Sequence, residues 1–156
     1  MLNSKQLRNL IIKPTLQELA MYSEEAEELL VFTCAVESLG GTFLKQLNGP
    51  ALGIYQMEPE TYNDLWQNYI YNKPNILLIL TSQFSNYNMP PEDKLIYDLR
   101  FATVMTRLFY LRIKEALPPK DNVELIYAYY KKYYNTSKGA ANFPDSYRKY
   151  ENFIKA

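Results

Sequence analysis

The stretch SEEAEELLVFTCAVESLGG, residues 23–41, contains the start signal, the body and the stop signal of one helix. Ser23 is a typical N-cap residue, and acidic residues follow it in the first turn, where the helix dipole favours negative charge. From Ala26 onward, apolar and small residues recur every three or four positions, which indicates one buried face. Two consecutive glycines end the pattern. Glu37 is the last member of the buried series, so we expect a carboxyl group at an inward-facing position in the last turn.

Helical periodicity dominates the rest of the chain as well. The residues from Leu95 to Ala116 keep an apolar step of three or four, which predicts a long central helix of about 34 Å. The apolar stretch 75–84 predicts a short buried helix, although its periodicity also fits a strand. The sequence therefore predicts a mainly α fold, with one domain over residues 1–156 and at most a small β-hairpin. The further expected segments are an N-terminal amphipathic helix, an irregular segment at 40–58, helices at 59–71, 123–134 and 147–156, and polar loops at 85–93 and 135–146.

The composition disfavours several classes of function. Hydrophobic residues make up 47% and charged residues 22%, which are ordinary globular values. The formal net charge of zero disfavours a nucleic-acid partner and a polybasic membrane anchor. No apolar run approaches the roughly 20 residues that span a bilayer, so no stable membrane association is expected. The apolar run near the start, NLII, is too short for a signal peptide. We therefore expect a cytoplasmic protein or one released by another route.

The chain has no histidine and a single cysteine, Cys34. This composition excludes Ser-His-Asp and Cys-His catalysis in their usual forms. We expect no metal site, because only carboxylates would remain to complete a zinc shell around one cysteine. Any acid–base chemistry must then use carboxylates, tyrosines, lysines or water.

Glu37 is the first candidate for such chemistry. A carboxyl group on a largely apolar face is desolvated, which raises its pKa and keeps it protonated closer to neutral pH. Such a group suits a general acid that protonates a leaving oxygen, as in glycosidic bond cleavage. The alternative is a structural glutamate that hydrogen-bonds backbone amides at the end of its helix.

The segment that follows carries a resemblance to a known family. The pattern ESLGG…GPALGIYQMEP, residues 37–59, resembles that of lytic transglycosylases and goose-type lysozymes, in which a helix-terminal Glu-Ser precedes Gly-Ala-x-Gly-Leu-hydrophobic-Gln. Far downstream, Tyr134-Asn135 resembles the Tyr-Asn with which that family closes its site. Together the three blocks span about two-thirds of the chain. The chain departs from the pattern in three places. Pro50 stands where the family has glycine, and the serine that the family has before that glycine is absent. The residues around Tyr134-Asn135 are not rich in alanine and glycine as they are in the family. A looser likeness to plant-type chitinases also exists.

The resemblance implies roles for several residues. Glu37 would be the catalytic acid. Gly53 would let the backbone turn tightly and let a sugar lie against the main chain. Gln56 would bridge the substrate or hold the loop, or else satisfy buried backbone groups. Tyr55 and Trp66 are candidates for stacking on sugar faces.

The downstream pair has its own implied roles. Tyr134 would hydrogen-bond Glu37, and Asn135 would hold a substrate acetamido group. The alternative is a helix C-cap with packed tyrosines.

A second carboxylate would be needed for hydrolysis with inversion, in order to activate water. Glu58 lies two residues after Gln56 and would project on the same side of an extended segment. Its alternative is favourable charge placement at the N-terminus of the next helix. Thr42 is a further candidate for positioning a water. A lytic transglycosylase needs no second acid, so the sequence leaves hydrolysis and transglycosylation open.

The resemblance implies a lysozyme-like fold and a peptidoglycan glycosidase that cuts between N-acetylmuramic acid and N-acetylglucosamine. No cofactor is expected, the partner is the glycan strand, and the protein would be a monomer. The features fit a phage lysis enzyme that stays in the host cytoplasm until a holin-made membrane lesion releases it to the wall, or an enzyme carried in the virion. Two other hypotheses stay open: a lysozyme-like domain that binds glycan or builds a virion without catalysis, and a chitinase.

Overall fold

The structure is a computed structural model, and it describes residues 1–85, 88–136 and 139–156. It consists mainly of helices, which confirms the predicted mainly α fold. The loops expected at 85–93 and 135–146 include residues 86, 87, 137 and 138, which lie outside the described residues. The elements in chain order are α1 (Ser4–Gln6), η1 (Leu7–Ile12), α2 (Lys13–Glu18), α3 (Glu24–Ser38), α4 (Pro59–Asn68), η2 (Ile70–Asn72), α5 (Pro74–Phe84), α6 (Lys94–Tyr97), α7 (Leu99–Leu111), α8 (Val123–Tyr130), η3 (Lys131–Asn135) and α9 (Phe143–Lys155).

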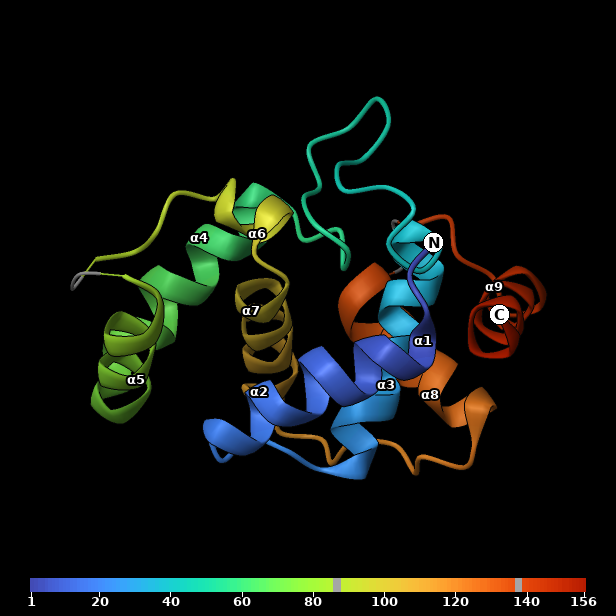
Figure 1. Cartoon of the computed structure of the whole chain (residues 1–156), viewed down its shortest axis with the longest axis horizontal. Coiled ribbons are helices and arrows are strands. Elements are labelled where there is room, and N and C mark those ends of the chain that lie inside the picture. The colour runs from blue at the N-terminus through green and yellow to red at the C-terminus, as the bar shows by residue number, and fades with distance from the viewer. Residues whose placement is uncertain (86–87, 137–138) are drawn as a thin grey trace.

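Helix α3 has the predicted bounds and lies at the centre of the helices that carry the site. The hydroxyl of Ser23 accepts a hydrogen bond from the amide of Ala26 at 3.0 Å, which confirms the predicted N-cap. The helix ends where Leu39 adopts a left-handed conformation (φ 51°), one residue before the two glycines. Helices α7, α8 and α9 all pack against α3, and Figure 1 shows it among them.

The predicted long central helix is wrong, because the chain divides it at Asp98. Residue 98 leaves the helical conformation (φ −112°, ψ 99°), and its side chain accepts a hydrogen bond from the amide of Phe101 at 2.9 Å. This N-cap ends α6 and starts α7, which stops at Leu111. With 13 residues α7 is about 20 Å long. The apolar periodicity continues across the break, so it did not reveal the cap.

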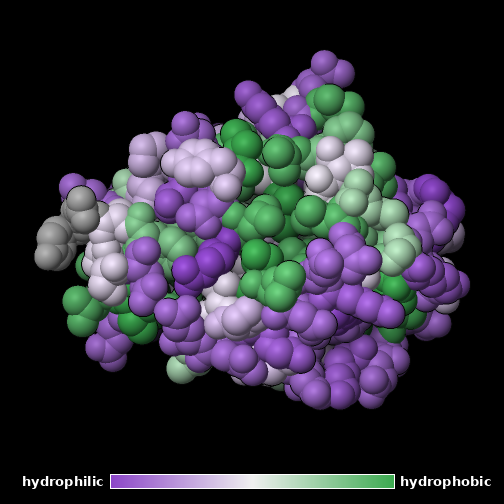
Figure 2. Space-filling model, in the orientation of Figure 1, coloured by the Kyte–Doolittle hydropathy of each residue, from purple (hydrophilic) through white to green (hydrophobic). Residues whose placement is uncertain are grey.

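Helix α5 corrects a second expectation. The stretch 75–84 is a helix, as predicted, but it is only partly buried. Leu80 and Thr81 are its buried residues, and Leu78 is 66% exposed. Four further apolar side chains are half-buried against the core: Ile76, Leu77, Ile79 and Phe84. Figure 1 shows α4 and α5 on one side of α7, away from α8 and α9. Figure 2 shows apolar surface over α5, and a larger apolar area near the middle of this face.

The segment between α3 and α4 is irregular, as predicted, with two isolated β-bridges, Lys45–Leu52 and Leu52–Met57. The second bridge closes a very small hairpin over residues 52–57. This agrees with the prediction of at most a small β-hairpin. Gly53 lies at its tip with φ 80°, and a Cβ atom there would stand 2.2 Å from the carbonyl oxygen of Leu95. Both the positive φ and this close approach require glycine.

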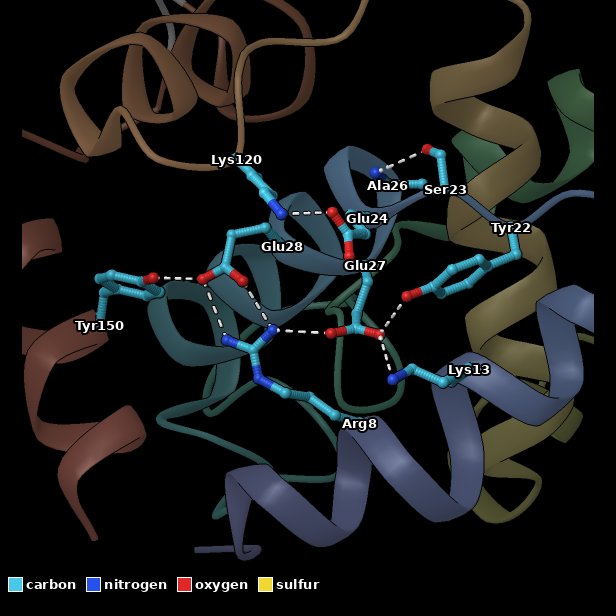
Figure 3. Close-up of polar contacts among 10 residues, drawn as sticks. All are labelled: Arg8, Lys13, Tyr22, Ser23, Glu24, Ala26, Glu27, Glu28, Lys120 and Tyr150. Atoms are coloured by element: carbon cyan, nitrogen blue, oxygen red, sulfur yellow. Dashed lines mark hydrogen bonds and ion pairs between the residues drawn. The ribbon is translucent and has the colours of Figure 1, made fainter.

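The N-terminal amphipathic helix is present as α1, η1 and α2 in direct succession, over residues 4–18. A π turn lies just before Pro14, where the amide of Lys13 bonds the carbonyl of Arg8. Proline cannot donate a hydrogen bond and crowds the carbonyl four residues back, and the wider turn accommodates both effects. Figure 3 shows that Arg8 of this helix contacts the carboxylates of Glu27 and Glu28 on α3.

A single hydrophobic core connects the helices from Leu7 to Phe153. Among the described residues, every helix falls short of the length and apolar character that crossing a bilayer requires.

Candidate functional site

Glu37 lies at the C-terminal end of α3 and lines a cleft of about 670 Å³. The other walls come from the segment before α4, from α7, from the end of α8 with η3, and from the start of α9. Sequence-distant elements therefore meet around one half-buried carboxyl group. Its described lining residues are Val36, Glu37, Gln46, Ala51, Gln56, Met57, Glu58, Thr61, Phe109, Tyr130, Tyr134, Asn135, Thr136, Gly139, Ala140, Ala141, Asp145 and Lys149.

The surroundings of Glu37 raise the pKa of its carboxyl group above the ordinary glutamate value. Burial is the largest cause, because the ionised form loses its hydration, and the nearby charge of Glu58 acts in the same direction. A hydrogen bond from Tyr130, the charge of Lys149 and hydrogen bonding by Asn135 act against it, because each stabilises the ionised form. Burial prevails, so Glu37 keeps its proton to a higher pH than an exposed glutamate does.

Tyr130, rather than Tyr134, is the tyrosine that contacts Glu37. The hydroxyl of Tyr130 donates to Oε2 of Glu37, whereas the hydroxyl of Tyr134 donates to the backbone carbonyl of Tyr55 at 2.5 Å. The predicted bond from Tyr134 is therefore wrong by one helical turn. The two rings stack with centroids 6.1 Å apart, as residues four apart on one helix face can. Tyr130 was missed, although its spacing of four from Tyr134 was a usable signal.

A π turn ends the helix that carries these tyrosines. In η3 the amide of Thr136 bonds the carbonyl of Lys131 at 2.7 Å, and Thr136 itself has φ 67°. Single π turns of this kind are frequent at functional sites. Asn135 lines the cleft with its Oδ1 bound to Nζ of Lys131 at 2.7 Å. Its predicted contact with a substrate acetamido group stays a prediction.

The predicted roles at residues 53–56 are corrected in part. Gln56 lines the cleft, but it is 94% buried and its Nε2 donates to the carbonyl of Gly53 at 2.8 Å, so it satisfies the backbone of its own turn. Gly53 makes room for the backbone of Leu95 and not for a sugar. Tyr55 is 1% exposed, with its hydroxyl 2.8 Å from Oγ1 of Thr103, so its predicted stacking on a sugar is wrong.

Trp66, a candidate for stacking on sugars, and Thr42, a candidate for positioning a water, are not among the described residues that line the cleft. Trp66 is completely buried in the core, so the prediction that it stacks on sugars is wrong as well. Thr42 is exposed and its hydroxyl donates to the carbonyl of Leu39 at 2.8 Å. Neither residue is part of the candidate site.

Glu58 stands exposed at the same cleft as Glu37. It occupies the N-cap position of α4, and its side chain makes no capping hydrogen bond there. The structure thus brings together the two carboxyl groups that the sequence singled out.

Ser38 was missed as a residue that supports the site. Its hydroxyl donates to the carbonyl of Ile54 at 2.6 Å and accepts from the amide of Gly41 at 2.8 Å. These bonds tie the end of α3 to the segment that contains Gln56. The signal was present in the sequence as the residue next to Glu37.

Asp145 and Lys149 of α9 were missed altogether. They lie at the cleft and form an ion pair with Nζ and Oδ2 3.0 Å apart. In the sequence they look like an ordinary i,i+4 pair on a surface helix.

Replacing Tyr130 by phenylalanine is expected to raise the pKa of Glu37 further, because the hydroxyl stabilises the ionised carboxylate. NMR titration of side-chain-labelled glutamate would follow this change without any need for activity. Tyr134→Phe is the matched control, because the hydroxyl of Tyr134 donates to a backbone carbonyl and not to Glu37. This variant should leave the pKa of Glu37 unchanged. A fall in the pKa of Glu37 in Tyr130→Phe would contradict this assignment.

The described residues contain no cluster of three or more His, Cys, Asp or Glu side chains that could hold a metal ion. Comparison with known proteins gives no match to a family model, a curated protein or a solved structure.

Proposed function

We propose that this chain is a peptidoglycan-cleaving glycosidase of the lysozyme-like superfamily, in which Glu37 is the general acid. The observation that carries the proposal is Glu37 itself: a half-buried carboxyl group with a raised pKa at the wall of a cleft. Enzymes that protonate a leaving oxygen near neutral pH tune a carboxylic acid in this way. The cleft volume of about 670 Å³ falls in the usual range for ligand sites.

The arrangement of the three sequence blocks gives further support. Residues from the Glu-Ser block, from the glycine-rich block and from the Tyr-Asn block all line the same cleft. The resemblance to lytic transglycosylases and goose-type lysozymes rests on those same blocks. Their convergence favours a shared site over three chance similarities.

In the proposed reaction Glu37 gives its proton to the oxygen of the β-1,4 bond between N-acetylmuramic acid and N-acetylglucosamine. The bond from that oxygen to C1 of the muramic acid breaks, and positive charge develops on the sugar ring. Tyr130 holds the carboxyl group in place and stabilises the carboxylate that remains. Asn135 lies beside it, where it can bind an acetamido group.

Two routes complete the reaction. Glu58 at the same cleft suits a general base that takes a proton from water as the water attacks C1, which gives hydrolysis with inversion. Alternatively the 6-hydroxyl of the muramic acid attacks its own C1 and gives its proton to the Glu37 carboxylate, which yields a 1,6-anhydro product. The presence of Glu58 favours hydrolysis.

Product analysis tests both the activity and its route. Purified protein is incubated with bacterial sacculi and, in parallel, with chitin, and the released fragments are analysed by mass spectrometry. We expect fragments from sacculi with reducing muramic acid ends. Ends in the 1,6-anhydro form would identify a transglycosylase, and release from chitin alone would identify a chitinase. If neither substrate releases fragments, the proposed glycosidase activity is wrong. The hypothesis that remains is a domain that binds glycan or builds a virion without catalysis.

A further inference from the structure

Lys149 is the single lysine or arginine among the described residues that line the cleft. It belongs to α9, and its side chain is 26% exposed. Lys149 and Glu37 line the same cleft, and the positive charge of Lys149 acts to lower the pKa of Glu37. A ligand bound with its reacting oxygen at Glu37 would therefore have Lys149 within electrostatic reach.

The ion pair that Lys149 forms does not commit it to a structural role. Asp145 lies 3.0 Å from Nζ of Lys149, and the same carboxylate accepts a second bond from Arg148 at 2.6 Å. If Lys149 turned to a ligand, Arg148 would still compensate the charge of Asp145. An i,i+4 pair of this kind is also weak, so little stability is lost when it opens.

The other charged residues of the described lining are acidic. Glu58 and Asp145 would repel a negatively charged substrate, whereas Glu37 is neutral when it holds the proton that it donates. No further cation in the described lining offsets the two acidic groups. An ammonium group is a compact charge with three donors, which suits a carboxylate held at one point.

We propose that Lys149 binds a carboxylate carried by the glycan next to the bond that is cut, and that it thereby selects acidic glycans over neutral ones. This inference rests on the proposed function. The 3-O-lactyl group of muramic acid supplies such a carboxylate in peptide-free strands, and an attached peptide supplies others. Chitin lacks both groups.

The test compares three substrates: peptide-free glycan strands, intact sacculi and chitin oligosaccharides. The variants are Lys149→Met, Lys149→Arg and, as a matched control on the same helix, Lys155→Met. Lys155 is exposed, pairs with Glu151 and is not among the described lining residues. For each variant the readout is the ratio of kcat/KM on the acidic substrate to kcat/KM on chitin. Any effect of Lys149 on the proton of Glu37 is common to all substrates and cancels in this ratio.

We expect Lys149→Met to lower the ratio about tenfold or more, mainly through KM, as the loss of a charge-assisted hydrogen bond predicts. Lys149→Arg should restore most of the ratio, and Lys155→Met should leave it unchanged. A loss with peptide-free strands identifies the lactyl carboxylate, and a loss with sacculi alone identifies a peptide carboxylate. If Lys149→Met slows all three substrates equally, Lys149 acts only on Glu37 or on stability, and the inference is wrong while the proposed function stands. If the wild-type protein cleaves none of them, the proposed function and the inference fail together.

Discussion

Glu37→Gln is expected to reduce the rate of sacculus cleavage by about a thousandfold, within the range for loss of a general acid. Glutamine has nearly the same shape, and its carbonyl oxygen can still accept the hydrogen bond from Tyr130. It cannot give a proton to the leaving oxygen. The measurement is kcat/KM from the release of soluble fragments. Glu60→Gln is the matched control, because this exposed glutamate of α4 is not among the described lining residues.

The same substitution is expected to stabilise the folded protein at neutral and higher pH. The pKa of Glu37 is raised on folding, so the folded state holds its proton where the unfolded state has already lost it. Stability therefore falls as pH rises from the ordinary glutamate range through the folded pKa. Glutamine does not titrate and avoids this loss, so its advantage should be absent in acid and appear on the alkaline side.

Urea unfolding of the two proteins under mildly acidic and mildly alkaline conditions measures this difference. Lower activity together with higher stability is the behaviour of a site kept for function at a cost to folding. If the variant cleaves sacculi at the wild-type rate, Glu37 is not the acid. If instead it loses stability throughout the pH range, its role is structural.

Local signals in the sequence were sufficient for α3 and for the position of Glu37. The cap at Ser23, the apolar spacing and the glycine stop act within a few residues, so the bounds of α3 are as predicted. The long helix failed because Asp98 competes for the backbone amide of Phe101, and an apolar period does not register such a cap. The exposure of α5 depends on what packs against it, which no local pattern records.

The sequence predicted which segments form the site better than it predicted which side chains contact one another there. The sequence placed Glu37, Gln56 and Glu58 near one another, and all three line one cleft. It did not distinguish Tyr130 from Tyr134, because that choice depends on how α8 faces α3. Tyr55 illustrates the same limit, since its ring points into the core.

A second large effect is expected near the other end of α3 from Glu37, where Arg8 lies between two carboxylates (Figure 3). Its Nη1 is 2.6 Å from Oε2 of Glu28 and 3.0 Å from Oε2 of Glu27, and Nη2 is 3.0 Å from Oε1 of Glu28. Tyr22 and Tyr150 donate to the same two carboxylates. The cluster joins the N-terminal helix, α3 and α9, and α9 also carries Lys149.

Burial makes this cluster sensitive to the loss of one partner. The side chains of Arg8, Glu27 and Glu28 are 21%, 12% and 15% exposed. Among the described residues, removing the arginine leaves Glu28 without a cation and Glu27 with only the longer pair to Lys13, at 3.9 Å. Both carboxylates have little hydration, and in such cases the lost partner costs more than the pair contributed. Arg8→Met is therefore expected to lower the free energy of unfolding by about 3 kcal/mol. The midpoint of thermal unfolding should fall by about 10 °C.

Two further variants separate the unpaired charges from other causes of this loss. Lys120→Met breaks the exposed pair with Glu24 and should leave the midpoint nearly unchanged. Adding Glu27→Gln and Glu28→Gln to Arg8→Met removes the uncompensated charges, while the amide oxygens still accept from the two tyrosines, so most of the stability should return. Urea unfolding of the four proteins measures the differences. If the triple variant is no more stable than Arg8→Met, the arginine stabilises the fold through its packing, and the charge-based account of this cluster is wrong.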